Sequence, residues 1–151
     1  MFAIKVVRAV PRYTESAKFE AQILKDLHTQ GGCERGIVYL KETFMNKSKQ
    51  SYGNVSNMCL VFEPLGKSLY DFIKDNGYKG FEINQIREIA IQSLQAIEFL
   101  HQLKLTHTDL KPENILLKYD TKETITDEAN FPIVSLSSFT HLSFKMSCLN
   151  W

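Results

Sequence analysis

Residues 107–114 read HTDLKPEN, and the apolar triplet ILL follows directly at 115–117. This stretch places a carboxylate (Asp109), an ammonium (Lys111) and an amide (Asn114) close together in sequence. Phosphoryl transfer needs such a set, because the carboxylate accepts the proton of an attacking hydroxyl, the cation neutralises phosphate charge and the amide oxygen helps to hold a metal ion. A solvated turn would account for some of these residues but not for the full string. The stretch therefore predicts a chemically active loop ahead of a short strand.

The sequence before this loop predicts a helical part. Residues 84–103 form the strongest helical pattern of the chain, with Asn84 as the expected N-cap and a single apolar stripe. The stripe is made of Ile86, Ala90, Leu94, Ile97 and Leu100. A shorter helix is expected at 68–75, and the boundary with the preceding part of the chain falls at 64–67.

Ahead of that boundary, the sequence predicts a small sheet with one helix on it. Strands are expected at 2–8, 37–44 and 58–63, and a helix at 14–28. The first strand is rich in Ile and Val and is expected to be well buried, whereas the polar residues 47–57 predict a turn between the last two strands. A sheet-rich part followed by a helical part makes the predicted fold class α+β.

The overall composition is that of one globular domain. The chain has 151 residues, of which 44% are hydrophobic and 23% are charged. Its net charge of +1 gives no reason to expect direct nucleic-acid binding or an anionic membrane as partner, and no apolar run approaches the ~20 residues that span a bilayer. The cysteines, Cys33, Cys59 and Cys148, lie too far apart for a disulfide framework or a zinc site, which favours a reducing, intracellular location.

A carboxylate in the middle of an apolar helical stripe is the second unusual feature. Glu20 lies between Ala17 and Leu24 on the face that would meet the sheet. A carboxylate that faces a core is costly unless it finds a cation. Lys5, centred in the strand sequence IKVV, has the same difficulty with the opposite sign. The two residues are therefore predicted to pair; the alternative is that Glu20 lies at the edge of the stripe and reaches solvent.

Together these features resemble the protein kinases. The loop 107–114 is similar to the family's catalytic loop, and FAIK at 2–5 resembles its strand motif V-A-I-K. Glu20 falls where the family places the glutamate of helix C, and MCLVFEPLG at 58–66 resembles the strand that leads into the hinge. The resemblance implies a partial protein-kinase-like fold over 1–117.

The same resemblance implies a division of the chain. Residues 1–65 would be part of the N-terminal lobe, an incomplete sheet with helix C, and residues 66–117 the start of the helical C-terminal lobe. Residues 118–151 are expected to form an irregular tail that is atypical of the family.

Within the kinases, the sequence resembles the CDC-like (LAMMER) family. The supporting stretches are HTDLKPEN at 107–114, VFEPLGKSLYDFI at 61–73 and residues 5–20. SR-protein kinases and dual-specificity tyrosine-regulated kinases are the alternatives. The resemblance implies an enzyme that phosphorylates serine, threonine and tyrosine, with arginine-serine-rich splicing factors as protein substrates and a nuclear location. Glu113 is expected either to face a basic residue of such a substrate or to bond within the loop.

The resemblance also implies a role for each matching residue in binding ATP and Mg²⁺. Lys5 would hold the phosphates, oriented by Glu20, and Asp109 would be the catalytic base. The remaining roles are Ala3 and Leu116 packing on the adenine, Phe62 as gatekeeper, the backbone of Glu63 and Leu65 bonding the adenine edge, Lys111 contacting phosphate and Asn114 as magnesium ligand.

The sequence departs from the family pattern in three places. The 151 residues contain no glycine-rich loop before Lys5 and no Asp-Phe-Gly after Asn114. The nearest match to the latter, at 136–140, has Ser138 in place of the aspartate, and serine is a poor substitute for a carboxylate on Mg²⁺. Thr108 stands where most kinases have the arginine that anchors a phosphorylated activation loop.

These departures leave three hypotheses about the function. The first is a LAMMER-type kinase of which this chain is a fragment, inactive in isolation. The second is a pseudokinase-like binding module that holds a partner through an exposed apolar face of helix 84–103. The third is an incomplete gene-model product without activity. The exact substrate and the oligomeric state do not follow from the sequence.

Overall fold

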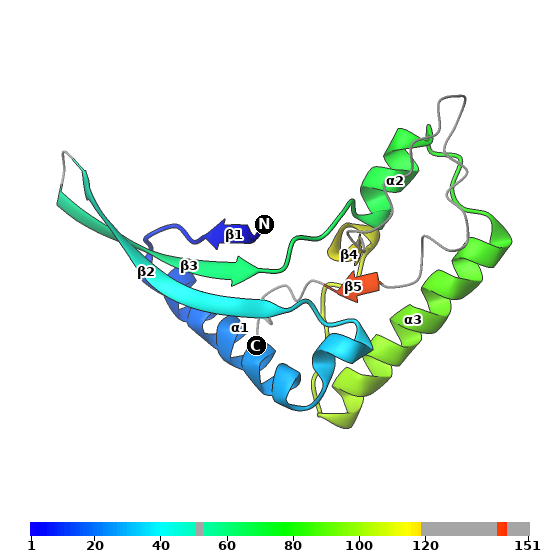
Figure 1. Cartoon of the computed structure of the whole chain (residues 1–151), viewed down its shortest axis with the longest axis horizontal. Helices are drawn as coiled ribbons and strands as arrows, with labels where there is room; N and C mark the ends of the chain where they lie inside the picture. Colours follow the sequence, from blue (N-terminus) through cyan, green and yellow to red (C-terminus); the bar gives the residue numbers. More distant parts are fainter. Residues whose placement is uncertain (51–52, 119–141, 145–151) are drawn as a thin grey trace.

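The computed structural model describes residues 1–50, 53–118 and 142–144, with side chains described for 1–47 and 56–118. It confirms an α+β fold in which a small antiparallel sheet with one long helix is followed by a helical part (Figure 1). No helix among the described residues is both long enough and apolar enough to cross a membrane.

The sheet has three strands in the order β1-β3-β2, all antiparallel. They are β1 (Ala3–Val6), β2 (Leu40–Gln50) and β3 (Gly53–Phe62). In the register of β1 on β3, Lys5 lies opposite Leu60, which is fully buried. Lys5 therefore lies on an edge strand, in a paired position beside the buried central strand β3.

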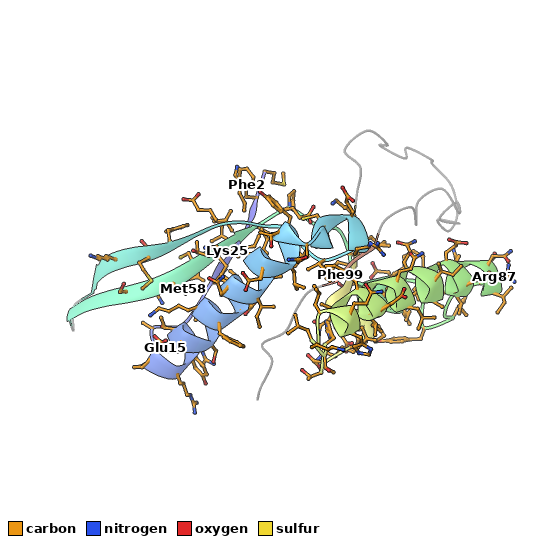
Figure 2. The ribbon with its side chains drawn as sticks, turned by 90° about the horizontal axis from the view of Figure 1, so that it is seen from below. Phe2, Glu15, Lys25, Met58, Arg87 and Phe99 are labelled. Atoms are coloured by element: carbon orange, nitrogen blue, oxygen red, sulfur yellow. The ribbon has the colours of Figure 1, made fainter. Side chains whose placement is uncertain are left out.

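Helix α1 (Pro11–Thr29) packs against β2 and β3. It begins with Pro11 in its first turn, where the missing N–H of proline costs nothing. Its buried face consists of Ala17, Glu20, Ala21, Leu24 and Leu27. The predicted stripe is confirmed, and Glu20 lies inside it. Figure 2 shows α1 lying along the sheet, with α3 in a separate part of the molecule.

Two helices follow the sheet. The shorter is α2 (Leu69–Asp75), which begins with a capping box between Ser68 and Asp71. The longer is α3 (Ile83–Gln102). A short turn around α1's C-terminus, η1 (Gly32–Arg35), touches both α1 and α3 and so connects the two parts.

Near its C-terminus α3 buries Ala96, Phe99 and Leu100, whereas most of the apolar residues before them are exposed. Leu100 is 1% exposed and Phe99 6%, whereas Leu94 is 66% and Ile83 70% exposed. In Figure 2, Phe99 lies at the end of α3 nearest the sheet and Arg87 at the far end. The open apolar face expected for this helix is therefore present in the described structure.

After α3 the chain runs through the loop 103–111 and the turn η2 (Pro112–Asn114) into β4 (Ile115–Leu117). Strand β4 pairs in antiparallel fashion with β5 (Leu142–Phe144). The expectation of an irregular tail from residue 118 is thus wrong for 142–144. A three-residue strand is too short to give an alternating pattern, and it is specified by the free backbone edge of β4.

Three further sequence expectations are corrected. The first strand is not well buried: Ile4 and Val6 are 56% and 60% exposed, because β1 is an edge strand of a sheet that α1 covers on one face. The expected turn at 47–57 is a hairpin whose strands extend to Gln50 and from Gly53. Polar side chains do not prevent such pairing, since the hydrogen bonds come from the backbone.

The N-cap of α3 is Glu82 and not Asn84, because a capping box forms between Glu82 and Gln85. The amide oxygen of Gln85 accepts a hydrogen bond from the backbone N–H of Glu82 at 3.1 Å. This box begins the helix one residue earlier than the pattern of apolar residues indicates.

Candidate functional site

The ion pair between Lys5 and Glu20 is the centre of the site. The Nζ of Lys5 on β1 lies 2.8 Å from Oε1 and 2.7 Å from Oε2 of Glu20 on α1. The side chain of Glu20 is only 3% exposed, whereas that of Lys5 is 38% exposed. Because a buried carboxylate is costly without a cation, the pair stabilises the packing of α1 on the sheet. The predicted pair forms, and the alternative in which Glu20 reaches solvent is wrong.

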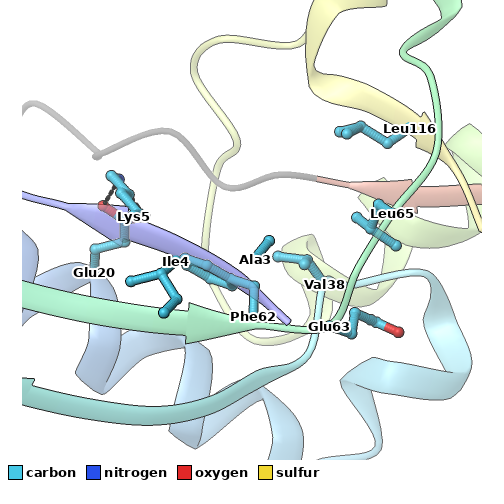
Figure 3. Close-up of a pocket in the computed structure, with 9 residues that line it drawn as sticks. All are labelled: Ala3, Ile4, Lys5, Glu20, Val38, Phe62, Glu63, Leu65 and Leu116. Atoms are coloured by element: carbon cyan, nitrogen blue, oxygen red, sulfur yellow. Dashed lines mark hydrogen bonds and ion pairs between the residues drawn. The ribbon is translucent and has the colours of Figure 1, made fainter. Parts of the chain in front are cut away.

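This pair borders a cavity of about 320 Å³. The lining residues are Ala3, Ile4, Lys5, Glu20, Val38, Phe62, Glu63, Leu65 and Leu116. They include the residues predicted to contact the adenine and the Lys5–Glu20 pair, but not Lys111 or Asn114. Figure 3 shows Ala3 on β1 and Leu116 on β4 contributing to the lining from the sheet and from the helical part. The cavity therefore lies between the two parts of the fold, with mostly apolar walls and one exposed ammonium.

Two lining residues were not identified from the sequence. Val38 is 4% exposed and follows the equally buried Ile37, just before β2 begins. The apolar pair is a visible signal, but it is also what any core strand contains. Ile4 gives no signal, because strand alternation would place it on the face opposite to Ala3 and Lys5. It is nevertheless among the residues that line the cavity.

Glu63 and Leu65 lie on the segment that joins the sheet to the helical part. The backbone N–H of Glu63 donates to the carbonyl of Tyr39 at 3.1 Å, and the Glu63 carboxylate accepts from the Tyr39 N–H at 2.8 Å. Because the N–H of Glu63 already donates to Tyr39, its carbonyl is the backbone group of Glu63 that could accept a hydrogen bond from a bound ligand.

The catalytic-loop residues form a second, local cluster. The Nδ2 of Asn114 donates to the backbone carbonyl and to Oδ2 of Asp109, both at 2.9 Å. The Nζ of Lys111 lies 3.0 Å from Oδ1 of Asp109. Asn114 is buried at 7% exposed, while the Asp109 side chain is 42% exposed. The structure therefore brings the three predicted catalytic residues together around one accessible carboxylate.

The backbone of this loop is held in a tight bend. Thr108 has φ of 44°, a left-handed conformation that a β-branched residue seldom adopts. Across Thr108, the N–H of Asp109 donates to the carbonyl of His107. His107 is 5% exposed. The bend leaves Asp109 partly exposed while His107, two residues earlier, stays buried. Strain of this kind persists where the surroundings fix the backbone.

Asn114 is suited to one magnesium bond. Both of its hydrogen bonds to Asp109 use Nδ2, which leaves the amide oxygen as the atom for a hard cation. Among the described residues there is no group of three or more His, Cys, Asp or Glu that could hold a metal ion. The other position considered for a metal ligand, Ser138, lies outside the described residues. Asn114 therefore stays the predicted magnesium ligand, and its amide oxygen is the atom that would bind the ion.

Comparison with known proteins identifies the family. The family model of the protein kinase domain matches residues 1–129. The chain is similar to Dual specificity protein kinase CLK1 of Homo sapiens, at 45% identity over 115 residues, covering 76% of this chain and 22% of that protein. It is similar to Serine/threonine-protein kinase AFC2 of Arabidopsis thaliana at 44% identity over 119 residues, covering 78% of this chain and 26% of that protein.

The structural comparison agrees. A crystal structure of a kinase domain matches with a TM-score of 0.69 at 46% sequence identity, covering 78% of this chain and 32% of that one. The chain therefore spans about a quarter to a third of the relatives that it matches. The chain therefore belongs to the protein kinase domain family, with similarity to its CDC-like (LAMMER) members.

Proposed function

We propose that this chain binds ATP in the cavity beside Lys5 and belongs to a protein that phosphorylates serine, threonine and tyrosine residues of other proteins. The observation that carries the proposal is the Lys5–Glu20 pair at the wall of the cavity. Glu20 is buried and fixed, so it holds the ammonium of Lys5 at one place, where it can also meet phosphate oxygens. The similar proteins include a serine/threonine-protein kinase and a dual specificity protein kinase, which supports phosphoryl transfer to protein hydroxyls.

The walls of the cavity fit an adenine ring. Ala3 and Leu116 supply apolar surface from two sides, and Phe62 closes the cavity on the β3 side. Adenine edges also need polar partners, which the carbonyl of Glu63 and the N–H of Leu65 would provide. Mg²⁺, when bound with ATP, neutralises charge on the phosphates. Asn114 is the described residue that would contact it.

Asp109 fits the role of proton acceptor for a substrate hydroxyl. Its carboxylate is 42% exposed, so a hydroxyl can reach it, and its two oxygens are oriented by Lys111 and Asn114. A positioned carboxylate of this kind accepts the proton as the hydroxyl attacks phosphorus. Lys111 supplies positive charge near the transferred group.

Glu113 favours basic protein substrates. It lies in η2, directly before Asn114, and is exposed. An exposed carboxylate beside the proton acceptor attracts a cationic residue next to the target hydroxyl. Arginine-serine-rich proteins carry such residues, and we propose them as the substrate class.

Nucleotide binding by the 151-residue chain tests this proposal. Isothermal titration calorimetry with ATP and Mg²⁺ is expected to give binding that Lys5→Met weakens by about 10-fold or more, because a charge-assisted contact is lost. Lys18→Met is the matched control, since Lys18 also pairs with a glutamate (Glu15, 2.8 Å) but lies outside the cavity. Equal affinities for the two variants would contradict the assignment.

We expect the chain by itself to transfer little phosphate to an arginine-serine peptide. Its 151 residues contain no glycine-rich loop before Lys5 and no Asp-Phe-Gly, and each of these contacts acts on the transition state. Radiolabel transfer from ATP measures this directly. Transfer that Asp109→Asn abolishes would show that the chain is a working enzyme as it stands.

A binding module is the second candidate, and the exposed apolar residues of α3 favour it. Ile83, Ile86 and Leu94 are between 46% and 70% exposed, which is unusual for residues of this kind on one helix. If this face holds a protein partner, Leu94→Lys should abolish the complex without changing ATP affinity. Sedimentation of the chain with and without that substitution distinguishes the two candidates.

A further inference from the structure

The side chain of Glu63 contacts both parts of the fold, a role separate from that of its backbone. Its Oε1 accepts from the N–H of Tyr39, at the start of β2, at 2.8 Å. Its Oε2 lies 3.1 Å from the Nζ of Lys118, the residue that follows β4. The Glu63 side chain is only 16% exposed, so both oxygens are used within a partly desolvated setting.

These contacts close a ring of bonds around the connecting segment. Downstream of Glu63, the N–H of Gly66 donates to the carbonyl of Leu117 at 2.8 Å, and the N–H of Leu117 donates to the carbonyl of Lys67 at 3.0 Å. Lys118 comes next in the chain and reaches back to Glu63. The segment 63–66 is therefore tied to β2 at its beginning and to β4 at its end. Glu63 and Leu65, which line the cavity, belong to this segment.

We infer that the Glu63 carboxylate is a positioning group, which fixes the segment 63–66 between the sheet and the helical part by joining Tyr39 to Lys118. The inference deepens the proposed function and rests on it for the consequence at the nucleotide. Without the carboxylate, the segment would keep the backbone bonds of Glu63 to Tyr39 and of Gly66 to Leu117, but it would lose the side-chain bonds to Tyr39 and Lys118. The backbone groups of Glu63 and Leu65 would then sample more orientations and bind adenine less well.

Amide exchange measured by NMR tests the two contacts without nucleotide. Glu63→Ala removes the acceptor for the Tyr39 N–H, and the exchange rate of that amide should rise about 5-fold, as expected for the loss of one hydrogen bond. Glu63→Gln keeps an acceptor oxygen and should restore the slow exchange. Unchanged exchange at Tyr39 in Glu63→Ala would overturn the inference.

Cys33 provides an independent reporter of the charges. Burial, followed by the negative charge of Glu63, raises the pKa of the Cys33 thiol, and the positive charge of Lys118 acts in the opposite direction. Glu63→Gln should therefore lower that pKa and accelerate alkylation of Cys33 at a fixed pH, while Lys118→Met should slow it. Peptide mapping by mass spectrometry resolves Cys33 from the other cysteines. Identical rates in the two variants would contradict the placement of both charges.

ATP affinity then separates the inference from the proposed function. Glu63→Ala should weaken binding about 3-fold, and Lys118→Met and Glu63→Gln about 2-fold each, with no further loss when the last two are combined. Lys18→Met is the control, because it breaks the exposed Lys18–Glu15 pair (2.8 Å) on α1, away from the segment. If ATP binds in a Lys5-dependent way but is unaffected by Glu63→Ala, the positioning role is wrong. If the chain does not bind ATP while Tyr39 and Cys33 respond as expected, the proposed function is wrong and the structural tie stands.

Discussion

The two charged clusters of this protein are built in opposite ways. Lys5 and Glu20 are separated by 15 positions, lie on a strand and a helix, and include a carboxylate whose side chain is 3% exposed. Asp109 and Asn114 are five positions apart on one loop, and the Asp109 side chain is 42% exposed. The first cluster exists only when α1 packs on the sheet. The second is held largely by its own loop.

This difference has consequences for stability and for function. A long-range pair with one buried member reports on the packing that brings it together, so that losing it should cost stability. A local, exposed cluster can lose a charge at little cost, because water replaces the partner. The same residues that are catalytically important can therefore be thermodynamically unimportant, and the following variants test that separation.

The largest effect is expected for Lys5→Met. Both hydrogen bonds from Lys5 to the buried Glu20 carboxylate are lost, so the free energy of unfolding should fall by about 2 kcal/mol. Urea unfolding followed by circular dichroism measures it. Lys18→Met breaks the exposed Lys18–Glu15 pair on α1, the helix that also carries Glu20. It should change the free energy of unfolding by less than about 0.5 kcal/mol. Equal losses would remove the distinction between buried and exposed pairs.

A smaller effect is expected within the loop, for Asn114→Ala. Asn114 is buried and makes two hydrogen bonds to Asp109, and their removal should cost about 1.5 kcal/mol. Lys111→Met breaks a pair in which both side chains are more than 40% exposed, and it should cost less than about 0.5 kcal/mol. If Lys111→Met proved the more costly of the two in urea unfolding, burial would not be what decides the stability of this loop.

The smallest effect concerns the capping box of α2, which is wholly local. Hydrogen bonds from the Ser68 side chain, and then from its backbone, hold the pKa of Asp71 below that of an ordinary aspartate. A carboxyl with a lowered pKa stabilises the folded state above its unfolded pKa, and this contribution is lost as the pH falls through the folded pKa. The melting temperature should therefore drop more steeply below about pH 4 in the unsubstituted chain than in Asp71→Asn.

That comparison has a clear failing outcome. Parallel melting curves for the two proteins between about pH 5 and pH 2 would mean that the Asp71 pKa is the same in the folded and unfolded states. The capping box would then be a geometric feature without an energetic role.

Much of the fold followed from patterns within single elements. The stripe of α1 and the loop with its short strand β4 were predicted, because their signals are contained in one stretch of sequence. The extent of burial was predicted less well. β1 reads as a core strand, but its exposure depends on which neighbours it has in the sheet, and that is a property of the assembled fold. Strand β5 was missed because its pairing partner, β4, lies far away in the sequence. The capping of α3 by Glu82 was missed although its partner Gln85 is local, because the pattern of apolar residues does not include polar capping pairs.

The sequence by itself determined which chemical groups are available. A buried glutamate and a strand lysine each require a partner of opposite charge, and the string HTDLKPEN concentrates a proton acceptor, a cation and an amide on one loop. Only the tertiary structure decided that Ala3, Phe62 and Leu116 face one cavity, and that the Glu63 side chain joins Tyr39 to Lys118. Residues so far apart in the chain meet through the packing of the sheet against the helical part, and no local pattern encodes that distance.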